Sequence, residues 1–67
     1  MSEKLRTSLK QLIDRKTSRT SEYLSLARRF DRLGKFSGAA KLRKIANEET
    51  QHIETCEKIL SELELKS

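Results

Sequence analysis

The segment "GKFSG", residues 34–38, contains both glycines of this chain and is the one clear break in an otherwise helical sequence. Gly34 suits the left-handed backbone conformation that closes a helix, and Ser37 suits the N-cap of a following helix. So short a turn makes its two helices antiparallel neighbours. The sequence therefore predicts one all-α hairpin domain over residues 1–67. The expected elements are helix one at about 3–33, the turn at about 34–37 and helix two at about 38–65.

Apolar residues recur at three- and four-residue spacing on both sides of the turn, which is typical of amphipathic helices. The stripe of helix one comprises Leu9, Leu12, Lys16, Tyr23, Ala27 and Phe30, with Leu5 and Ile13 beside it. The stripe of helix two comprises Leu42, Ile45, Glu49, His52, Cys56, Ile59 and Leu63, with Ala46, Ile53 and Leu60 beside it. A single hairpin covers only one side of each stripe, so we expect a second copy to cover the rest. The predicted assembly is a homodimer or larger oligomer built as a four-helix bundle.

The segment "KTSRTSE", residues 16–22, is the weakest part of the predicted first helix. Serine and threonine compete with the helix for backbone hydrogen bonds. Two alternatives follow: the helix is continuous, or it kinks and restarts here with Ser18 or Ser21 as the cap.

The composition predicts a small cytoplasmic protein with no membrane partner. No apolar run approaches the length of a membrane span, and the first ten residues, "MSEKLRTSLK", lack the apolar centre of a signal peptide. The single cysteine, Cys56, fits a reducing compartment. No nucleophile–base pair or phosphate-binding glycine loop is visible, so the sequence predicts enzymatic activity only if a metal site is completed.

Charge is segregated along the chain, although the net charge is only +5. Residues 1–44 hold thirteen Lys and Arg against four Asp and Glu, whereas residues 45–67 hold two against six. Near the turn, Asp31 is the only acid among seven bases. These bases are Arg28, Arg29, Arg32, Lys35, Lys41, Arg43 and Lys44. The cluster suits the phosphates of a nucleic acid or the surface of an acidic protein, and a solvated basic surface is the alternative.

Glu49 and His52 form a Glu-x-x-His pair, in which two residues three apart share one face of a helix. A carboxylate and an imidazole suit iron or manganese, and Cys56 four residues on would favour zinc if it were a ligand rather than a small core residue. In four-helix bundles such pairs join glutamates of other helices in di-metal sites. The alternative is structural: Lys16 of the facing stripe pairs with Glu49, and His52 completes a buried polar layer.

The segment from about residue 20 to about residue 60 resembles one helical hairpin of the rubrerythrin and ferritin-like di-iron proteins. The residues that carry this resemblance are Tyr23, Ala27, Gly34, Ala39, Ile45, Ala46, Glu49 and His52. It implies a four-helix bundle, iron or manganese as cofactor, and ferroxidase- or peroxidase-like chemistry. The two-helix size is similar to the short encapsulated ferritins, which assemble their site between subunits.

The chain departs from this family at the first-helix ligand position, where it has Lys16 in place of a glutamate. Glu22 is the nearest substitute at the level of Glu49, but it lies about 100° around the helix from the core stripe. Two hypotheses follow. The first is a ferritin-like metal-binding protein with Glu49, His52 and, less directly, Glu22 as ligands. The second is a metal-free dimeric adaptor or nucleic-acid-binding protein, similar in size to the RNA-binding Rop-type hairpins, that acts through its basic turn end.

Overall fold

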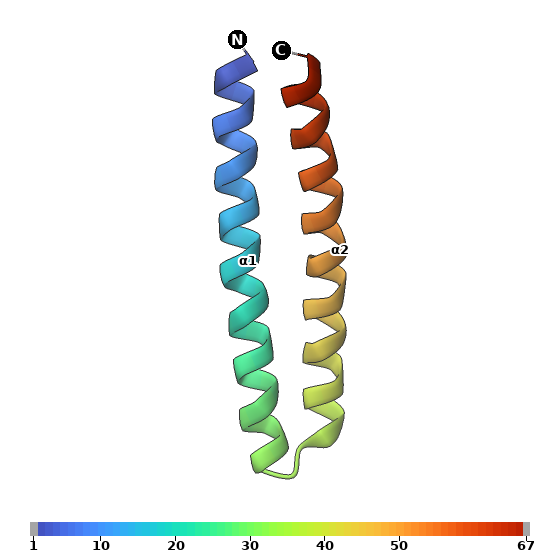
Figure 1. Ribbon diagram of the computed structural model, residues 1–67. Coiled ribbons are helices and arrows are strands. Elements are labelled where there is room, and N and C mark those ends of the chain that lie inside the picture. Colours follow the sequence, from blue (N-terminus) through green and yellow to red (C-terminus); the bar gives the residue numbers. More distant parts are fainter. Residues whose placement is uncertain (1, 67) are drawn as a thin grey trace.

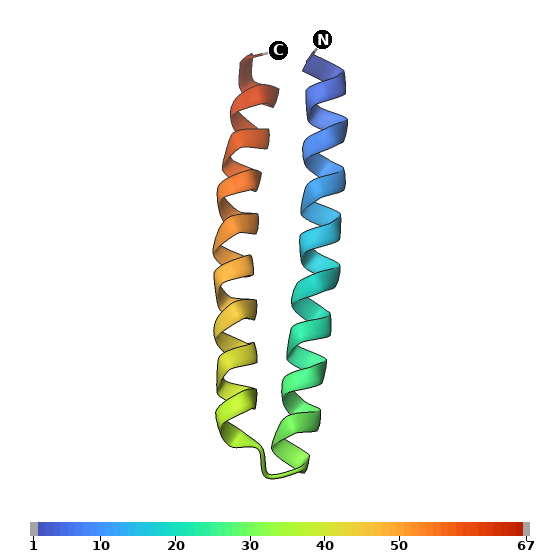
Figure 2. The same ribbon diagram turned by 180° about the vertical axis from the view of Figure 1, so that it is seen from behind.

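The computed structural model describes residues 2–66, and the side chains of residues 3–65. Helix α1 comprises Ser2–Arg32 and helix α2 comprises Phe36–Lys66. The two helices run antiparallel, side by side, with both chain ends at the same end of a hairpin that measures 51 × 14 × 10 Å (Figures 1 and 2). The predicted all-helical hairpin is therefore confirmed. Over the described residues, neither helix has a stretch long and apolar enough to cross a membrane.

Gly34 closes α1, as its backbone φ of 75° shows. The Lys35 amide donates to the Phe30 carbonyl at 2.9 Å, and the Gly34 amide donates to the Asp31 carbonyl at 3.0 Å. These two bonds form a Schellman motif, which satisfies carbonyls that the helix end would leave without donors. Only glycine adopts this left-handed conformation without steric cost, so it fixes where the hairpin turns.

The turn is tighter than the sequence predicted. It comprises residues 33–35, and α2 begins at Phe36 rather than near residue 38. The Lys35 carbonyl already accepts the first helical bond, from the Ala39 amide at 3.1 Å. Ser37 consequently lies inside the first turn of α2, and the expectation that it would be the N-cap is wrong.

Helix α1 is continuous through residues 16–22, so of the two alternatives for this segment the unbroken helix is the one observed. The Thr17 hydroxyl donates to the Ile13 carbonyl and the Thr20 hydroxyl donates to the Lys16 carbonyl, each at 2.8 Å. Both hydroxyls therefore find acceptors one turn back within the unbroken helix, and neither serves as a cap.

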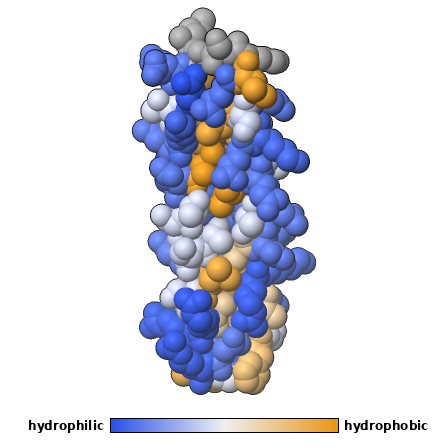
Figure 3. All heavy atoms as spheres, viewed as in Figure 1, coloured by the Kyte–Doolittle hydropathy of each residue, from blue (hydrophilic) through white to orange (hydrophobic). Residues whose placement is uncertain are grey.

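The two helices meet along a seam that repeats every seven residues. Its members are buried or half-buried and alternate at three- and four-residue steps. In α1 they are Arg6, Leu9, Ile13, Lys16, Thr20, Tyr23, Ala27 and Phe30, and in α2 they are Ala39, Leu42, Ala46, Glu49, Ile53, Cys56, Leu60 and Leu63. This is the heptad pattern of a coiled coil. On the face seen in Figure 3, an apolar band follows the seam between hydrophilic side chains of both helices.

The seam is narrower than the expected stripes, and four residues predicted to point inward are exposed instead. They are Leu12, Ile45, His52 and Ile59. A 3.6-residue period would give each helix a broad inward face. The observed 3.5-residue period instead keeps only two positions of each heptad in contact with the partner helix. These four residues sit at the margin of the seam, and the inward positions belong to their neighbours Ile13, Ala46, Ile53 and Leu60.

Small side chains bring the helices together near the turn. Ala27, Ala39 and Ala46 are the fully buried apolar residues among those described, at 1%, 0% and 2% exposure. The Phe30 ring packs against the backbone of Gly38, since a Cβ at Gly38 would come within 2.5 Å of the phenylalanine ring. The hairpin thus has a thin core, in which the larger apolar side chains of the seam are only half-buried.

Candidate functional site

A polar layer interrupts the seam halfway along the hairpin. Lys16 Nζ lies 3.3 Å from Glu49 Oε2, and His52 Nδ1 lies 3.3 Å from Glu49 Oε1. The Lys16 and Glu49 side chains are 25% and 21% exposed, while His52 is 60% exposed. Both carboxylate oxygens therefore have partners. The sequence offered, as the alternative to a metal site, a Lys16–Glu49 pair with His52 completing a buried polar layer. That alternative predicted these contacts, but it was wrong in placing His52 in a buried position.

The contacts of Glu49 change its acidity. Burial acts to raise the pKa of Glu49, but the hydrogen bonds and charges of Lys16 and His52 outweigh it and hold the pKa below the ordinary value of 4.5. Glu49 is therefore ionised at neutral pH. The layer is an ion pair between the helices with an imidazole attached at its exposed side.

This pair gives the layer a stability that depends on pH. Because the folded-state pKa of Glu49 is lowered, its contribution is present above pH 4.5 and is lost as the pH falls through the folded-state value. We expect the Glu49→Gln variant to unfold a few degrees below wild type at neutral pH. Well below the folded-state pKa of Glu49 the two unfolding temperatures should converge, because the carboxyl group is then neutral in both the folded and the unfolded state.

Thermal unfolding followed by circular dichroism, at fixed protein concentration and at several pH values, measures this difference. Glu48→Gln is the matched control, since it removes one carboxylate from an exposed position on the same turn of α2. A gap between wild type and Glu49→Gln that stays constant down to the most acidic pH at which the helices remain folded would contradict the ion-pair assignment.

The layer offers a metal ion few ligands. Glu49 and His52 are adjacent, but the Lys16 ammonium has no lone pair to donate and repels a cation. Among the described residues, no three His, Cys, Asp or Glu side chains are grouped closely enough to hold one metal ion. Cys56 is a free, half-buried cysteine on the seam, whereas His52 is exposed at its margin.

Glu22 is not brought to the polar layer. It is exposed on the outer side of α1, where it lines a shallow hollow with Asp14, Arg15, Ser18 and Arg19. A second hollow beside it reaches the layer itself and is lined by Leu12, Arg15, Lys16, Arg19 and Glu49. Arg19 is a residue that sequence reasoning missed as a neighbour of Glu49. Arg19 lies three residues after Lys16, and residues at that spacing share a helix face, so the sequence could have indicated that it lies near Glu49.

The predicted basic cluster lies at the turn end, and we call it the basic turn end. Arg43 Nη1 forms a 2.7 Å salt bridge with Asp31 Oδ2. The other six members, Arg28, Arg29, Arg32, Lys35, Lys41 and Lys44, are exposed. The apolar side chains of Leu33 and Phe36 are also exposed at the tip, at 71% and 66%. The structure thus gathers these cations at one end of the hairpin, on both helices.

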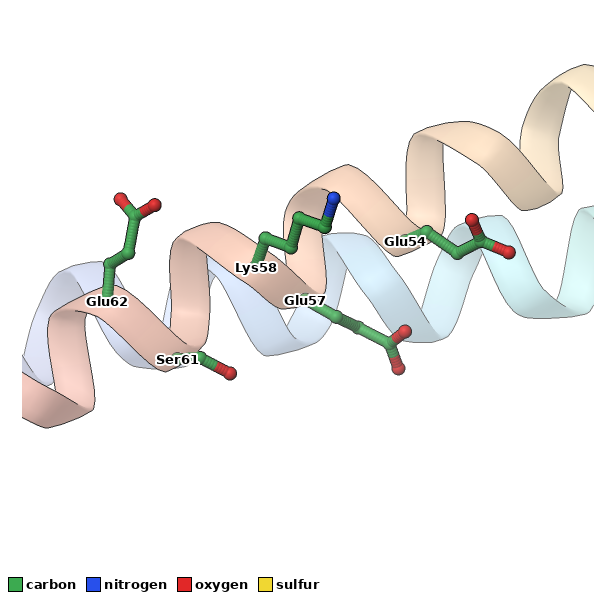
Figure 4. A pocket seen from close by; sticks show the side chains of 5 residues that line it. All are labelled: Glu54, Glu57, Lys58, Ser61 and Glu62. Atoms are coloured by element: carbon green, nitrogen blue, oxygen red, sulfur yellow. The ribbon is translucent and has the colours of Figure 1, made fainter.

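A further depression lies on α2 near the other end of the hairpin (Figure 4). It is lined by Glu54, Glu57, Lys58, Ser61 and Glu62. All five side chains come from one helix, and Figure 4 shows that they point in different directions. Since they do not converge on one point, this depression is not a binding site.

Comparison of the chain with protein-family models, with curated proteins and with solved structures gives no significant match. The resemblance to the rubrerythrin and ferritin-like proteins therefore stays a prediction.

Proposed function

We propose that this protein is a non-enzymatic nucleic-acid-binding module, in which two hairpins pair into a four-helix bundle and the basic turn ends contact the phosphate backbone. The observation that carries the proposal is the basic turn end. Seven Lys and Arg side chains share it with one carboxylate, Asp31, which pairs with Arg43. In the described part of the chain, no carboxylate forms an ion pair with any of the other six.

Several of these cations are arginines, which suit phosphate because the planar guanidinium forms two parallel hydrogen bonds. A nucleic-acid duplex carries one negative charge per about 1.7 Å of its axis, so cations spread around one end of a hairpin engage several phosphates together. Arg28, Arg32 and Lys44 lie on the outer sides of their helices, away from the seam. A long, uniformly charged polymer fits this distribution better than a compact acidic patch on a protein.

The polar layer supports the same proposal. A metal-binding function would need Lys16 to leave the Glu49 carboxylate and a second chain to supply further ligands. The ferritin-like function stays the second candidate, because Glu49 and His52 are in contact as its half-site requires. Iron or manganese retained by the purified protein, and lost in both Glu49→Ala and His52→Ala, would favour that candidate.

Fluorescence anisotropy with labelled DNA and RNA duplexes of mixed sequence tests the proposal. If the dimer neutralises about four phosphates, its affinity should fall roughly 100-fold between about 50 and about 200 mM salt, with little dependence on sequence. Labelled polyglutamate serves as the comparison polyanion. No binding to either duplex at low salt would overturn the proposal. Equal affinity for polyglutamate would also contradict it and would indicate an acidic protein partner.

A further inference from the structure

One margin of the seam is apolar. This margin is made of residues seven apart that directly precede the seam residues Arg6, Ile13, Thr20 and Ala27 in α1 and Ala46, Ile53 and Leu60 in α2. They are Leu5, Leu12, Arg19 and Leu26 in α1 and Ile45, His52 and Ile59 in α2. We call these residues the apolar edge. Leu5, Leu12 and Ile59 line one apolar groove with Leu9 and Leu63, so the two helices present this edge on the same side of the hairpin. Five of the exposed large apolar side chains belong to it, with exposures between 37% and 59%.

The opposite margin is polar at every position except Leu24. These residues directly follow the seam residues Leu9, Lys16, Tyr23 and Phe30 in α1 and Leu42, Glu49, Cys56 and Leu63 in α2. They are Lys10, Thr17, Leu24 and Asp31 in α1 and Arg43, Thr50, Glu57 and Glu64 in α2. The Asp31–Arg43 salt bridge crosses this polar edge and shows that its two halves also share a side. Exposed apolar surface is thus concentrated on one side of the hairpin. The fully buried apolar residues among those described, by contrast, are all alanines. Concentrated exposed apolar surface of this kind marks an interaction site.

The apolar edge is complementary to itself. In α1 its sequence is Leu12, Arg19, Leu26, and in α2 it is Ile45, His52, Ile59, so each helix places one polar residue between two apolar ones. Arg19 and His52 lie at about the same level, each next to the Lys16–Glu49 pair. A two-fold axis through this level superposes apolar on apolar and polar on polar, as an isologous interface requires.

Charges beside the apolar edge determine which way the second copy points. With the turns at opposite ends of the bundle, α1 faces its own copy, and residues on opposite sides of Arg19 come to similar levels. Arg15, four residues before Arg19, then lies within one residue of the level of Glu22 of the partner subunit, which is three residues after Arg19. Helix α2 also faces its own copy. Lys41, eleven residues before His52, lies within one residue of the level of Glu62 of the partner subunit, ten residues after His52. All four of these residues are exposed, so each contact joins opposite charges at the rim of the interface.

The other two-fold arrangement places both turns at the same end, with α1 facing α2 of the second copy. Glu22 then lies within one residue of the level of Glu48 of the partner subunit, and Arg29 within one residue of the level of Lys41 of the partner subunit. Both contacts join like charges, and each occurs twice by symmetry. Like charges across an interface are unfavourable. The arrangement with opposite turns has one like-charge contact, between Arg19 and its own copy at the axis, beside four opposite-charge contacts. The arrangement with both turns at one end has four like-charge contacts, so it is disfavoured.

We propose that the apolar edge is the interface with a second copy of this chain, related by a two-fold axis at the Arg19 and His52 level, with the two turns at opposite ends. This inference rests on the four-helix bundle of the proposed function and specifies its geometry. The basic turn ends then lie at opposite ends of the dimer, so each dimer presents two separate basic ends.

Disulfide trapping in a Cys56→Ala background tests this arrangement, because a disulfide forms only when two Cα atoms come within about 7 Å. Leu12 and Leu26 lie at equal offsets from Arg19. We expect a mixture of the Leu12→Cys and Leu26→Cys chains to give at least about tenfold more covalent dimer than either chain alone. Circular dichroism confirms that each variant retains its helices before oxidation.

A mixture of the Leu12→Cys and Ile59→Cys chains is the matched control. Those positions face each other only if both turns lie at the same end, so efficient trapping of this pair would overturn the proposed arrangement while leaving a four-helix bundle. Trapping of neither pair, together with a monomer mass for wild type, would overturn the interface itself. Nucleic-acid binding is measured separately, so failure of the basic turn end does not affect this result.

Discussion

The Leu26→Glu variant is expected to be a monomer at concentrations where wild type is a dimer, which has twice the 7.8 kDa chain mass. Leu26 is 40% exposed in the single hairpin, so the substitution leaves the fold of one chain nearly unaffected. In the dimer, its side chain would face the apolar Leu12 of the partner subunit. Burying a carboxylate against an apolar surface costs several kcal/mol, so the dimer should weaken by at least about 100-fold.

Leu24→Glu provides an unusually close control. Leu24 has the same residue type on the same helix, is 38% exposed, and lies on the polar edge. It should remain dimeric with wild-type affinity. Sedimentation equilibrium over a range of concentrations measures both variants. Equal weakening by the two substitutions would mean that the apolar edge has no special role in association.

Much of the fold could be predicted from the residues around the turn. Gly34 allowed the left-handed closure to be placed correctly, and the spacing of apolar residues on both sides indicated two long helices. The start of α2 was predicted about two residues too late, because Ser37 looked like a cap. The Lys35 carbonyl takes the first helical bond instead, and this choice depends on the geometry of the turn rather than on residue type.

The inward faces could be predicted only in part. In α2, one stripe through Ile45, His52 and Ile59 and another through Ala46, Ile53 and Leu60 both satisfy a helical period. Contact with α1 selects the second stripe, since two long helices that stay in contact follow a 3.5-residue repeat. His52 therefore lies at a margin, although it has the correct spacing for a ligand.

The polar layer illustrates what sequence reasoning can and cannot decide at a site. Lys16 and Glu49 share the level at which antiparallel helices face each other, so their ion pair could be anticipated. The exposure of His52 could not, because it depends on which of two adjacent stripes is buried. Glu22 was considered as a ligand on the basis of its level along the hairpin. Its position on the outer side of α1 separates it from Glu49.

We propose that the basic turn end holds nucleic acid, and a pair of charge variants tests this claim. One variant combines Arg28→Gln, Arg32→Gln and Lys44→Gln, which removes three cations from the outer sides of the helices at the turn end. The other combines Lys4→Gln, Lys10→Gln and Lys58→Gln, which removes three cations from the opposite half of the hairpin. Both variants lower the net charge of +5 equally, and both leave the apolar edge intact.

The decisive measurement is the dissociation constant of each variant for one DNA duplex, determined at several salt concentrations. We predict that the turn-end variant loses roughly 10- to 100-fold in affinity at about 100 mM salt and that its salt slope becomes shallower by up to about 2.7, near 0.9 per lost phosphate contact. The opposite-end variant should keep the wild-type slope. Equal losses in both variants, or full wild-type affinity in the turn-end variant, would contradict the claim.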